Sequence, residues 1–439
     1  IRVSKDIGVI SLIDPKIKGF SDITLKGTYN SEAQKINLDV NFDSLIYDNI
    51  KLNQFKTNVF DRNDSLIVRS SLNSIDVGKT KINNISLGAT SNLTGLYSRL
   101  RIENETEKNN LELVTVANFN NDTINIRFPR SRIRINNKNW TINPGNSIFI
   151  LDSIFRFNNF VLQEGEQKIS IENKQNLSDA IVKIENLDLA DLAQIVDTTK
   201  ILKSGFLDAN LNLKNALKSP EIDGDLRLRK LNVFDEEIDL INFDARLSDE
   251  TKMLNIDGFI KDNDYSVQLS GNYALTKGVV SPIDLDVSFD KLSLKFLEFP
   301  VILGKEISNL NAFAKGQINV SGSVKDIALN GKATIIDTAS LKVNFLGTTF
   351  KFANEDIVLK KKSIEFYKGG LFDKTITVMD EFNNKGTLRA KLEHNSFKDF
   401  SVQASIITDK FNFLNTTYKD NKDFFGKVYA SGVVDINGP

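Results

Sequence analysis

Hydrophobic and polar residues alternate along most of this chain. Ile36, Leu38, Val40 and Phe42 are separated by Asn37, Asp39 and Asn41, and the same alternation recurs at 124–128, 265–269, 285–289 and 388–392. Successive side chains of a β-strand point to opposite faces, so each run predicts a strand with one apolar and one polar side. Because this one-sided pattern is typical of antiparallel sheets, we expect an all-β, antiparallel fold.

Short polar segments separate these runs. The segments 235–237, 261–264 and 383–386 are rich in Asn, Asp or Glu, and each lies between two apolar runs. Asn and Asp tolerate a left-handed backbone and bond to their own backbone, so the segments predict hairpin turns. Helical spacing of apolar residues occurs at 187–196 and, interrupted by Pro300, at 292–303. We therefore expect only a few short helices.

Two repeated patterns indicate how the strands are organised. A motif of the form apolar-x-apolar-x-Gly ends at Gly27, Gly258, Gly271, Gly322, Gly331 and Gly438. A glycine that closes a strand predicts a bulge, a sharp turn or the close approach of two backbones. A longer match relates 213–224 to 320–331, and a third copy begins near 430. Divergent repeats of this kind favour one continuous, elongated sheet of stacked strands.

Composition restricts the chemistry. The 439 residues include 56 Lys+Arg, 57 Asp+Glu, one His, no Cys and 30 Phe. Without cysteine there is no disulfide, no thiolate nucleophile and no Cys-ligated metal. The balanced charge argues against a dedicated nucleic-acid-binding protein. We therefore expect neither an enzyme nor a cofactor-binding protein, and no nucleic-acid partner.

The length and the chain ends also carry information. Single hydrophobic cores stop growing near ~250–300 residues, so a chain of this size calls for several domains or a repeat array. The sequence begins with Ile1 and ends with Pro439 directly after a strand-like run. We therefore expect it to be a piece of a longer protein. No run approaches the ~18 apolar residues that predict a transmembrane helix.

Three segments resemble chemical sites only superficially. His394, the single histidine, has no nucleophile motif near it. The triplet 78–80 has the Gly-Lys-Thr of a phosphate-binding loop, but Asn73 stands where that loop needs a glycine. The acidic and amide residues of 37–43 have Phe42 where a calcium loop needs a glycine. Structural roles are favoured for all three segments.

One basic cluster has no acidic residues within it. It consists of Arg127, Arg130, Arg132, Arg134 and Lys138, and Trp140 follows. Such a cluster is able to contact lipid headgroups or phosphates. The alternation of Arg132 and Arg134 with isoleucines favours instead the basic outer face of one strand.

The apolar strand faces allow two interpretations. They can form the closed core of a sandwich or barrel, or they can line an open groove that acyl chains or an apolar partner fill. From the strand pattern alone, the closed core is favoured.

The last part of the chain carries an ordered set of motifs. They are 345–352 (FLGTTFKF), 376–380 (ITVMD), 383–386 (NNKG), 411–417 (FNFLNTT), 424–426 (FFG) and the strand-like run that ends at 438. This succession resembles the C-terminal domain of the TamB family, the inner-membrane component of the translocation and assembly module, in its Bacteroidetes form. The motif positions that are structural in the family are Gly347, Asp380, Asn383, Gly386, Asn415, Gly426, Gly432 and Gly438.

The resemblance covers 310–439, whereas 1–309 resembles only the looser repeats of the family and its AsmA-like relatives. The resemblance implies a repeating β-groove region at 1–309 and the truncated start of the C-terminal domain at 310–439. The family usually has Gly where this chain has Asn383. Since Asn also adopts a left-handed backbone, we expect the turn to survive.

The family resemblance implies a U-shaped sheet, or β-taco, whose apolar inner face carries phospholipids across the periplasm. Candidate lining residues are Ile36, Leu38, Val40, Phe42, Val267, Leu269, Leu285, Val287, Phe289, Val343 and Phe345. The implied partners are phospholipid acyl chains, an Omp85-type outer-membrane barrel, and the inner membrane through an anchor outside this segment. Two alternatives stay open: a scaffold for outer-membrane protein assembly, and a polysaccharide-binding or adhesive repeat domain.

Overall fold

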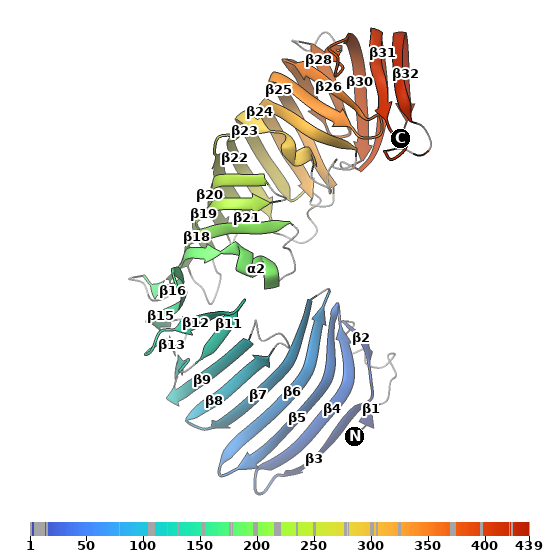
Figure 1. The fold of residues 1–439 in the computed structure, drawn as a ribbon. Coiled ribbons are helices and arrows are strands. Elements are labelled where there is room, and N and C mark those ends of the chain that lie inside the picture. The colour runs from blue at the N-terminus through green and yellow to red at the C-terminus, as the bar shows by residue number, and fades with distance from the viewer. Residues whose placement is uncertain are drawn as a thin grey trace. The chain divides into compact units, whose positions relative to one another are not determined.

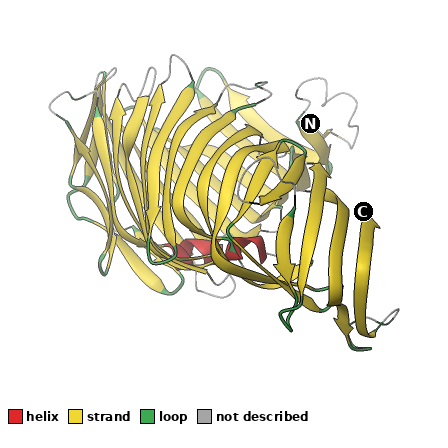
Figure 2. Cartoon of the chain, turned by 90° about the horizontal axis from the view of Figure 1, so that it is seen from above, coloured by secondary structure: helices red, strands yellow, loops and turns green. Residues whose placement is uncertain are grey.

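The fold is built almost entirely from strands. The computed structural model describes residues 2–3, 14, 16–78, 80–103, 110–120, 122–129, 131–151, 154–174, 177, 179–195, 201–214, 221–233, 236–248, 252–275, 279, 281–298, 303, 306–323, 326–368, 375–395, 398–420, 422 and 425–438. Neighbouring strands pair antiparallel, and strands dominate the view in Figure 2. The all-β, antiparallel prediction is confirmed. The chain divides into two compact units, Ile1–Glu221 (unit 1) and Ile222–Pro439 (unit 2).

Unit 1 begins with a run of strands that pair in chain order. Its elements are β1 (Arg2–Val3), β2 (Ile17–Phe20), β3 (Ile23–Asn30), β4 (Lys35–Tyr47), β5 (Ile50–Arg62), β6 (Ser65–Val77), β7 (Thr80–Asn92), β8 (Gly95–Glu103), β9 (Asn110–Asn120), β10 (Thr123–Arg127), β11 (Arg132–Ile135), β12 (Lys138–Ile142), β13 (Ser147–Leu151), β14 (Ile154–Asn158), β15 (Phe160–Glu164), β16 (Gln167–Asn173), β17 (Ala180–Asp188), α2 (Leu189–Ile195) and β18 (Leu202–Lys214). Strands β3 to β9 lie side by side (Figure 1). At β9 the sheet branches, because one end of this strand pairs with β10 and the other with β11.

Unit 2 repeats this plan. Its elements are β19 (Glu221–Val233), β20 (Glu236–Ser248), β21 (Met253–Lys261), β22 (Tyr265–Ala274), β23 (Ile283–Ser293), η1 (Lys295–Glu298), β24 (Ile307–Ser323), β25 (Asp326–Val343), β26 (Thr348–Ala353), β27 (Glu355–Lys360), β28 (Ser363–Lys368), β29 (Ile376–Met379), β30 (Lys385–Asn395), β31 (Lys398–Thr416) and β32 (Gly426–Gly438). Strands β19 to β25 pair in order, and β25 then pairs with both β26 and β27. The two branches rejoin at β30, which leads to β31 and β32. The expected boundary at residue 310 falls inside β24.

The two predicted helical segments are shorter in the structure. The segment 187–196 gives α2, which begins at Leu189 because Leu187 and Asp188 complete β17. In the segment 292–303 the described residues form the 3-10 turn η1 at Lys295–Glu298, and 299–302 lie outside the described part of the chain. The predicted turn at 261–264 joins β21 to β22, and there Asp262 Oδ1 accepts the backbone N–H groups of Asp264 and Tyr265. Of the predicted turn at 235–237, Glu236 and Glu237 already belong to β20, and residue 235 lies outside the described part of the chain.

The apolar alternation changes phase at one point along each of the strands β4 to β7. On one side of this point the cross-strand row is Phe42, Phe55, Leu72 and Ile85. On the other side, three residues along each strand, the row is Leu45, Leu52, Ile75 and Ile82. Between the two rows, Gln54 and Asn84 have positive φ angles of 53° and 50°. A left-handed residue inside a strand turns the backbone, and Asn tolerates that conformation better than most residues. This turn keeps both rows apolar although their spacing along each strand is odd.

The glycines of the repeated motif lie where two backbones approach. A Cβ added at Gly27, Gly258, Gly271, Gly322 or Gly331 would come within 2.6 Å of a neighbouring backbone oxygen, whereas Gly438 faces open space. At Gly258 the added Cβ would also lie 2.5 Å from Cδ1 of Phe243, its cross-strand partner. The Phe243 ring therefore occupies the space that the missing side chain leaves. The predicted close approach is confirmed at five of these six positions.

We expect Gly258→Ala to destabilise unit 2 by about 1–3 kcal/mol, because the methyl group displaces Phe243 from its place. Gly438→Ala is the matched control, since Gly438 ends the same motif and has no heavy atom near the added Cβ. Urea unfolding of both variants measures the difference. Equal unfolding midpoints for the two variants would show that the Phe243–Gly258 contact does not contribute.

Candidate functional site

The apolar side of unit 2 forms rows that cross six strands. The central row is Phe243, Gly258, Leu269, Val287, Ile318 and Gly331, from β20 to β25. A parallel row contains Ala245, Ile256, Gly271, Leu285, Val320 and Leu329. Cross-strand partners share a face, so these rows form one apolar surface, the unit-2 apolar face. The residues between the rows, such as Asp257 and Ser270, are exposed on the other side.

The apolar side of unit 1 is similar. Phe42, Phe55, Leu72, Ile85, Ile102 and Leu111 form one row from β4 to β9, and the rings of Phe42 and Phe55 stack with centroids 5.0 Å apart. Thr57 and Ser70 stand in the neighbouring row and bond to each other. Among the described side chains of β4 to β8, no apolar one is fully buried. We call this surface the unit-1 apolar face.

The structure distributes the candidate lining residues among three environments. Ile36, Leu38, Val40, Phe42, Leu269, Leu285, Val287 and Val343 are half-buried. Val267 and Phe289 are buried in a closed cluster with Tyr265, Leu310, Ala314 and Ile335, against which Leu297 of η1 packs. Phe345 lies in the turn after β25 with 61% of its surface exposed. One end of the unit-2 face is therefore closed by packing.

Two shallow hollows lie against strands β20 to β25 of unit 2. They measure about 800 and 770 Å³ and share Gln268, Ser288 and Gln317. Asp244 and Asp257, direct cross-strand neighbours, lie at the edge of the larger hollow. Amide, hydroxyl and carboxylate side chains line both hollows, and the lining of the larger one also includes Leu269, Val287 and Ile318 of the central row.

The basic cluster is not a single surface in the structure. Arg132 is exposed, Arg130 lies outside the described residues, and Lys138 lies on the apolar side of β12 with Trp140 and Ile142. Lys138 Nζ is 2.8 Å from Asp191 Oδ2 and 3.2 Å from Asp188 Oδ2. The cluster has no acidic residue within it in the sequence, but the fold places two carboxylates beside Lys138, that of Asp188 at the end of β17 and that of Asp191 on α2.

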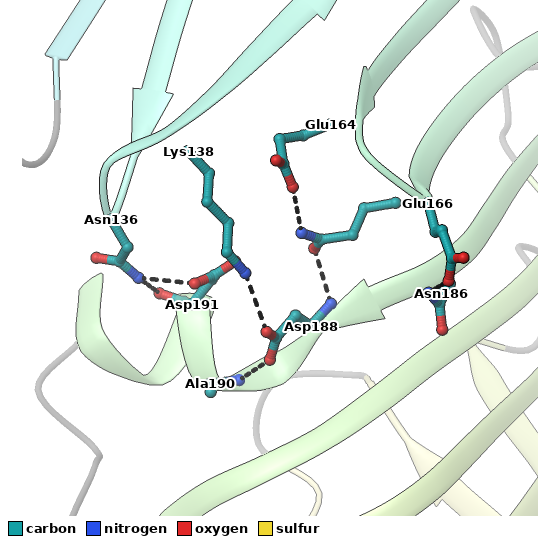
Figure 3. A network of polar contacts seen from close by, with 9 residues as sticks. Asn136, Lys138, Glu164, Glu166, Asn186, Asp188, Ala190 and Asp191 are labelled. Atoms are coloured by element: carbon teal, nitrogen blue, oxygen red, sulfur yellow. Dashed lines mark hydrogen bonds and ion pairs between the residues drawn. The ribbon is translucent and has the colours of Figure 1, made fainter.

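These ion pairs belong to a network that attaches α2 to the sheet (Figure 3). Asn136 donates to Asp191 Oδ1 at 3.2 Å, and the Asp188 N–H donates to Gln167 Oε1 at 2.9 Å. Asp188 Oδ1 accepts the N–H of Ala190 and so caps the helix. The hydrogen bond from Lys138 to Asp191 raises the pKa of the lysine, although burial opposes this. Lys138 therefore stays charged at neutral pH.

Four family-motif residues meet at a second polar centre. The turn after β29 contains Asp380 and Asn383, and Gly386 lies on the adjoining β30. Asn383 has φ 68°, which confirms the expected left-handed turn. Asn415 of β31 donates to Glu381 Oε1 at 2.6 Å. Gly347 also reaches this strand, since a Cβ there would lie 2.3 Å from Asn415 O.

Asp380 is the centre of this cluster. Its side chain is fully buried and accepts bonds from the N–H groups of Phe382, Asn384 and Asn412 at 2.8–2.9 Å, and from Asn384 Nδ2 at 2.9 Å. Burial opposes ionisation, but these hydrogen bonds outweigh it and hold the pKa of Asp380 below its ordinary value. The carboxylate therefore joins β29, β30 and β31. The role of this centre is structural.

The remaining motif glycines lie on β32. Gly426 and Gly432 have φ angles of 131° and 109°, and Gly438 pairs with Val402. The structure does not bring these three residues to the Asp380 centre.

His394 is buried near the end of β30. It is 5% exposed, its ring lies 5.8 Å from that of Phe400, and burial lowers its pKa. The folded protein therefore holds a neutral imidazole where the unfolded chain would bind a proton. This environment fits the predicted structural role.

We expect the stability of unit 2 to fall as pH drops below about 6.5, the ordinary pKa of histidine. The unfolded chain binds the proton there and the folded chain does not, so acid favours unfolding. Thermal unfolding at pH 7.5 and 5.5 measures the change, and His394→Gln should remove it. A pH dependence that persists unchanged in His394→Gln would assign it to other groups.

Comparisons with known proteins add no relative, since no protein-family model, curated protein or solved structure matches the chain. Among the described residues, no helix has both the length and the apolar character needed to cross a membrane. Within the same ranges, His, Asp and Glu side chains do not gather in threes where they could hold a metal ion. The two apolar faces are therefore the features on which a function can be argued.

Proposed function

We propose that the protein binds phospholipid acyl chains along its apolar faces and conducts them along the sheet. The observation that carries this proposal is the half-exposed state of the unit-1 apolar face. A closed sandwich core buries its inward side chains fully. Every described apolar side chain from β4 to β8 instead keeps some exposure, although the row from Phe42 to Ile102 runs unbroken across these strands.

The energetics fit an acyl chain. Burying each CH₂ group contributes about 0.8 kcal/mol, so a hydrocarbon tail binds to an apolar row without polar contacts along its length. A U-shaped curvature of the sheet would shield the tail from water. Such a surface needs no catalytic group. The function we infer is lipid transfer and not covalent chemistry.

The setting we propose is the cell envelope. It follows from the motif similarity to the TamB family at 345–438, which includes the Asp380 turn and Asn415. In this proposal the protein bridges the periplasm, is anchored in the inner membrane outside this segment, and meets an Omp85-type barrel at the outer membrane.

Native mass spectrometry tests the binding step. The purified protein should retain phospholipid, or should take it up when incubated with phosphatidylethanolamine vesicles. A protein that emerges without lipid and takes none from vesicles would contradict the proposal.

A further inference from the structure

The helix α2 lies on the apolar side of β12. Lys138 lies on the apolar side of β12, and its ammonium group reaches α2 at Asp191 (Figure 3). The helix also packs against β18. In this region Trp140 is 3% exposed, and Ala209 of β18 is buried as well. The apolar side chains are thus half-exposed on β4 to β8, whereas Trp140 and Ala209 in the region of α2 are buried.

The attachment of α2 depends strongly on charge. The helix has seven residues, and its buried apolar side chains among those described are Leu189 and Ala193. Leu192 is among the exposed large apolar residues. A helix of two turns is not stable by itself in water, so its place depends on contacts with the sheet. Of the two ion pairs that Lys138 makes, the shorter is with Asp191, which is 5% exposed.

We propose that α2 is a displaceable cover over an acyl-chain subsite beside Trp140, and that the ion pairs of Lys138 hold it closed. This inference rests on the proposed lipid binding and adds a regulated position to it. The ligand class is a phospholipid with ester-linked chains. The buried Nε1–H of Trp140 has no hydrogen-bond acceptor within the described structure. An ester carbonyl supplies the acceptor that this N–H lacks.

Fluorescence of Trp140 tests the cover directly, because Trp140 is the single tryptophan. Bromine on an acyl chain quenches a tryptophan that it contacts. The protein is mixed with vesicles of phosphatidylcholine brominated on its acyl chains, as wild type and as Lys138→Gln. Loss of the ion pairs should open the cover more often, and we expect quenching to rise about fivefold.

Lys168→Gln is the matched control. Lys168 lies on β16, and its ammonium group is 2.8 Å from the carboxylate of Glu185. Its side chain is on the polar side of the sheet, opposite to that of the next residue, Ile169. Its removal changes the charge equally and should leave quenching at the wild-type level. Salt gives a second readout without mutation. Raising NaCl from about 0.05 to 0.5 M screens the Lys138 pairs and should increase quenching in the wild type.

The possible outcomes separate the two proposals. If lipid binds, by native mass spectrometry, but Trp140 is quenched equally in wild type and Lys138→Gln, α2 is not a cover. If lipid binds and Trp140 stays unquenched in both proteins and at high salt, no acyl subsite lies beneath the helix. If no lipid binds to any variant, the proposed function fails, and the cover fails with it. Circular dichroism confirms that Lys138→Gln is folded.

Discussion

Replacing Asp380 by alanine is expected to destabilise unit 2 by about 3–5 kcal/mol. The substitution leaves the N–H groups of Phe382, Asn384 and Asn412 without their acceptor, and Asn412 is itself fully buried. Each buried donor left unpaired costs about 1–3 kcal/mol. Because the carboxylate joins three strands, its loss should loosen β29, β30 and β31 together. Urea unfolding followed by circular dichroism measures the loss.

Asp420 offers a matched control. It also accepts two hydrogen bonds, from the backbone N–H and the hydroxyl of Thr417, and its pKa is likewise lowered by them, but it is exposed. Asp420→Ala should therefore change stability much less. Since the folded pKa of Asp380 is below the unfolded value of about 3.9, its contribution is present above that pH and is lost in stronger acid. Equal effects of Asp380→Ala and Asp420→Ala would contradict the structural role of Asp380.

Placing a charge on the unit-2 apolar face is expected to abolish most acyl-chain binding there. Val287 stands in the central row between Leu269 and Ile318. Val287→Asp should weaken binding by about 2 kcal/mol, or ~30-fold, because the carboxylate must be desolvated and two or three CH₂ contacts are lost. Titration with a fluorescent fatty acid measures the affinity.

Ser288→Asp is the control for this experiment. Ser288 follows Val287 on β23 and lies on the polar side, where it pairs with Gln268 and Gln317. The same charge there should leave the affinity unchanged. Val287→Thr keeps the shape and replaces one methyl group by a hydroxyl, so an intermediate loss is expected. Identical affinities for Val287→Asp and Ser288→Asp would mean that acyl chains do not bind to this face.

Local patterns predict the strands and turns well. The alternation at 36–42 and 285–289 gives β4 and β23, since the period of two depends only on neighbouring residues. The left-handed turn at Asn383 follows from the backbone preference of that single residue. The helix at 187–196 is found but shortened, because Asp188 serves as the last residue of β17 and as the cap of α2. Patterns at short range are enough for all of these features.

Contacts between distant residues escape this kind of reasoning. Lys138 and Asp191 are 53 positions apart, and only the placement of α2 on the sheet makes them partners. The Asp380 carboxylate meets Asn412 across 32 positions. The segment 376–380 ends in Asp380, but no periodicity in the sequence shows that this residue is buried. Gln54 has a left-handed backbone, but a Gln within a strand-like run does not by itself predict this conformation. The feature of the sequence that indicates it is the change of phase in the apolar alternation next to Gln54.

The binding of acyl chains to one side of the sheet is tested most directly by photo-crosslinking. A phosphatidylcholine with a diazirine at the end of one acyl chain is bound to the protein and activated, and the labelled residues are mapped by mass spectrometry. We expect labels on alternate residues of the apolar rows, such as Leu269, Val287 and Ile318. Labels found equally on Gln268, Ser288 and Gln317, or no labels at all, would contradict acyl-chain binding on the apolar face.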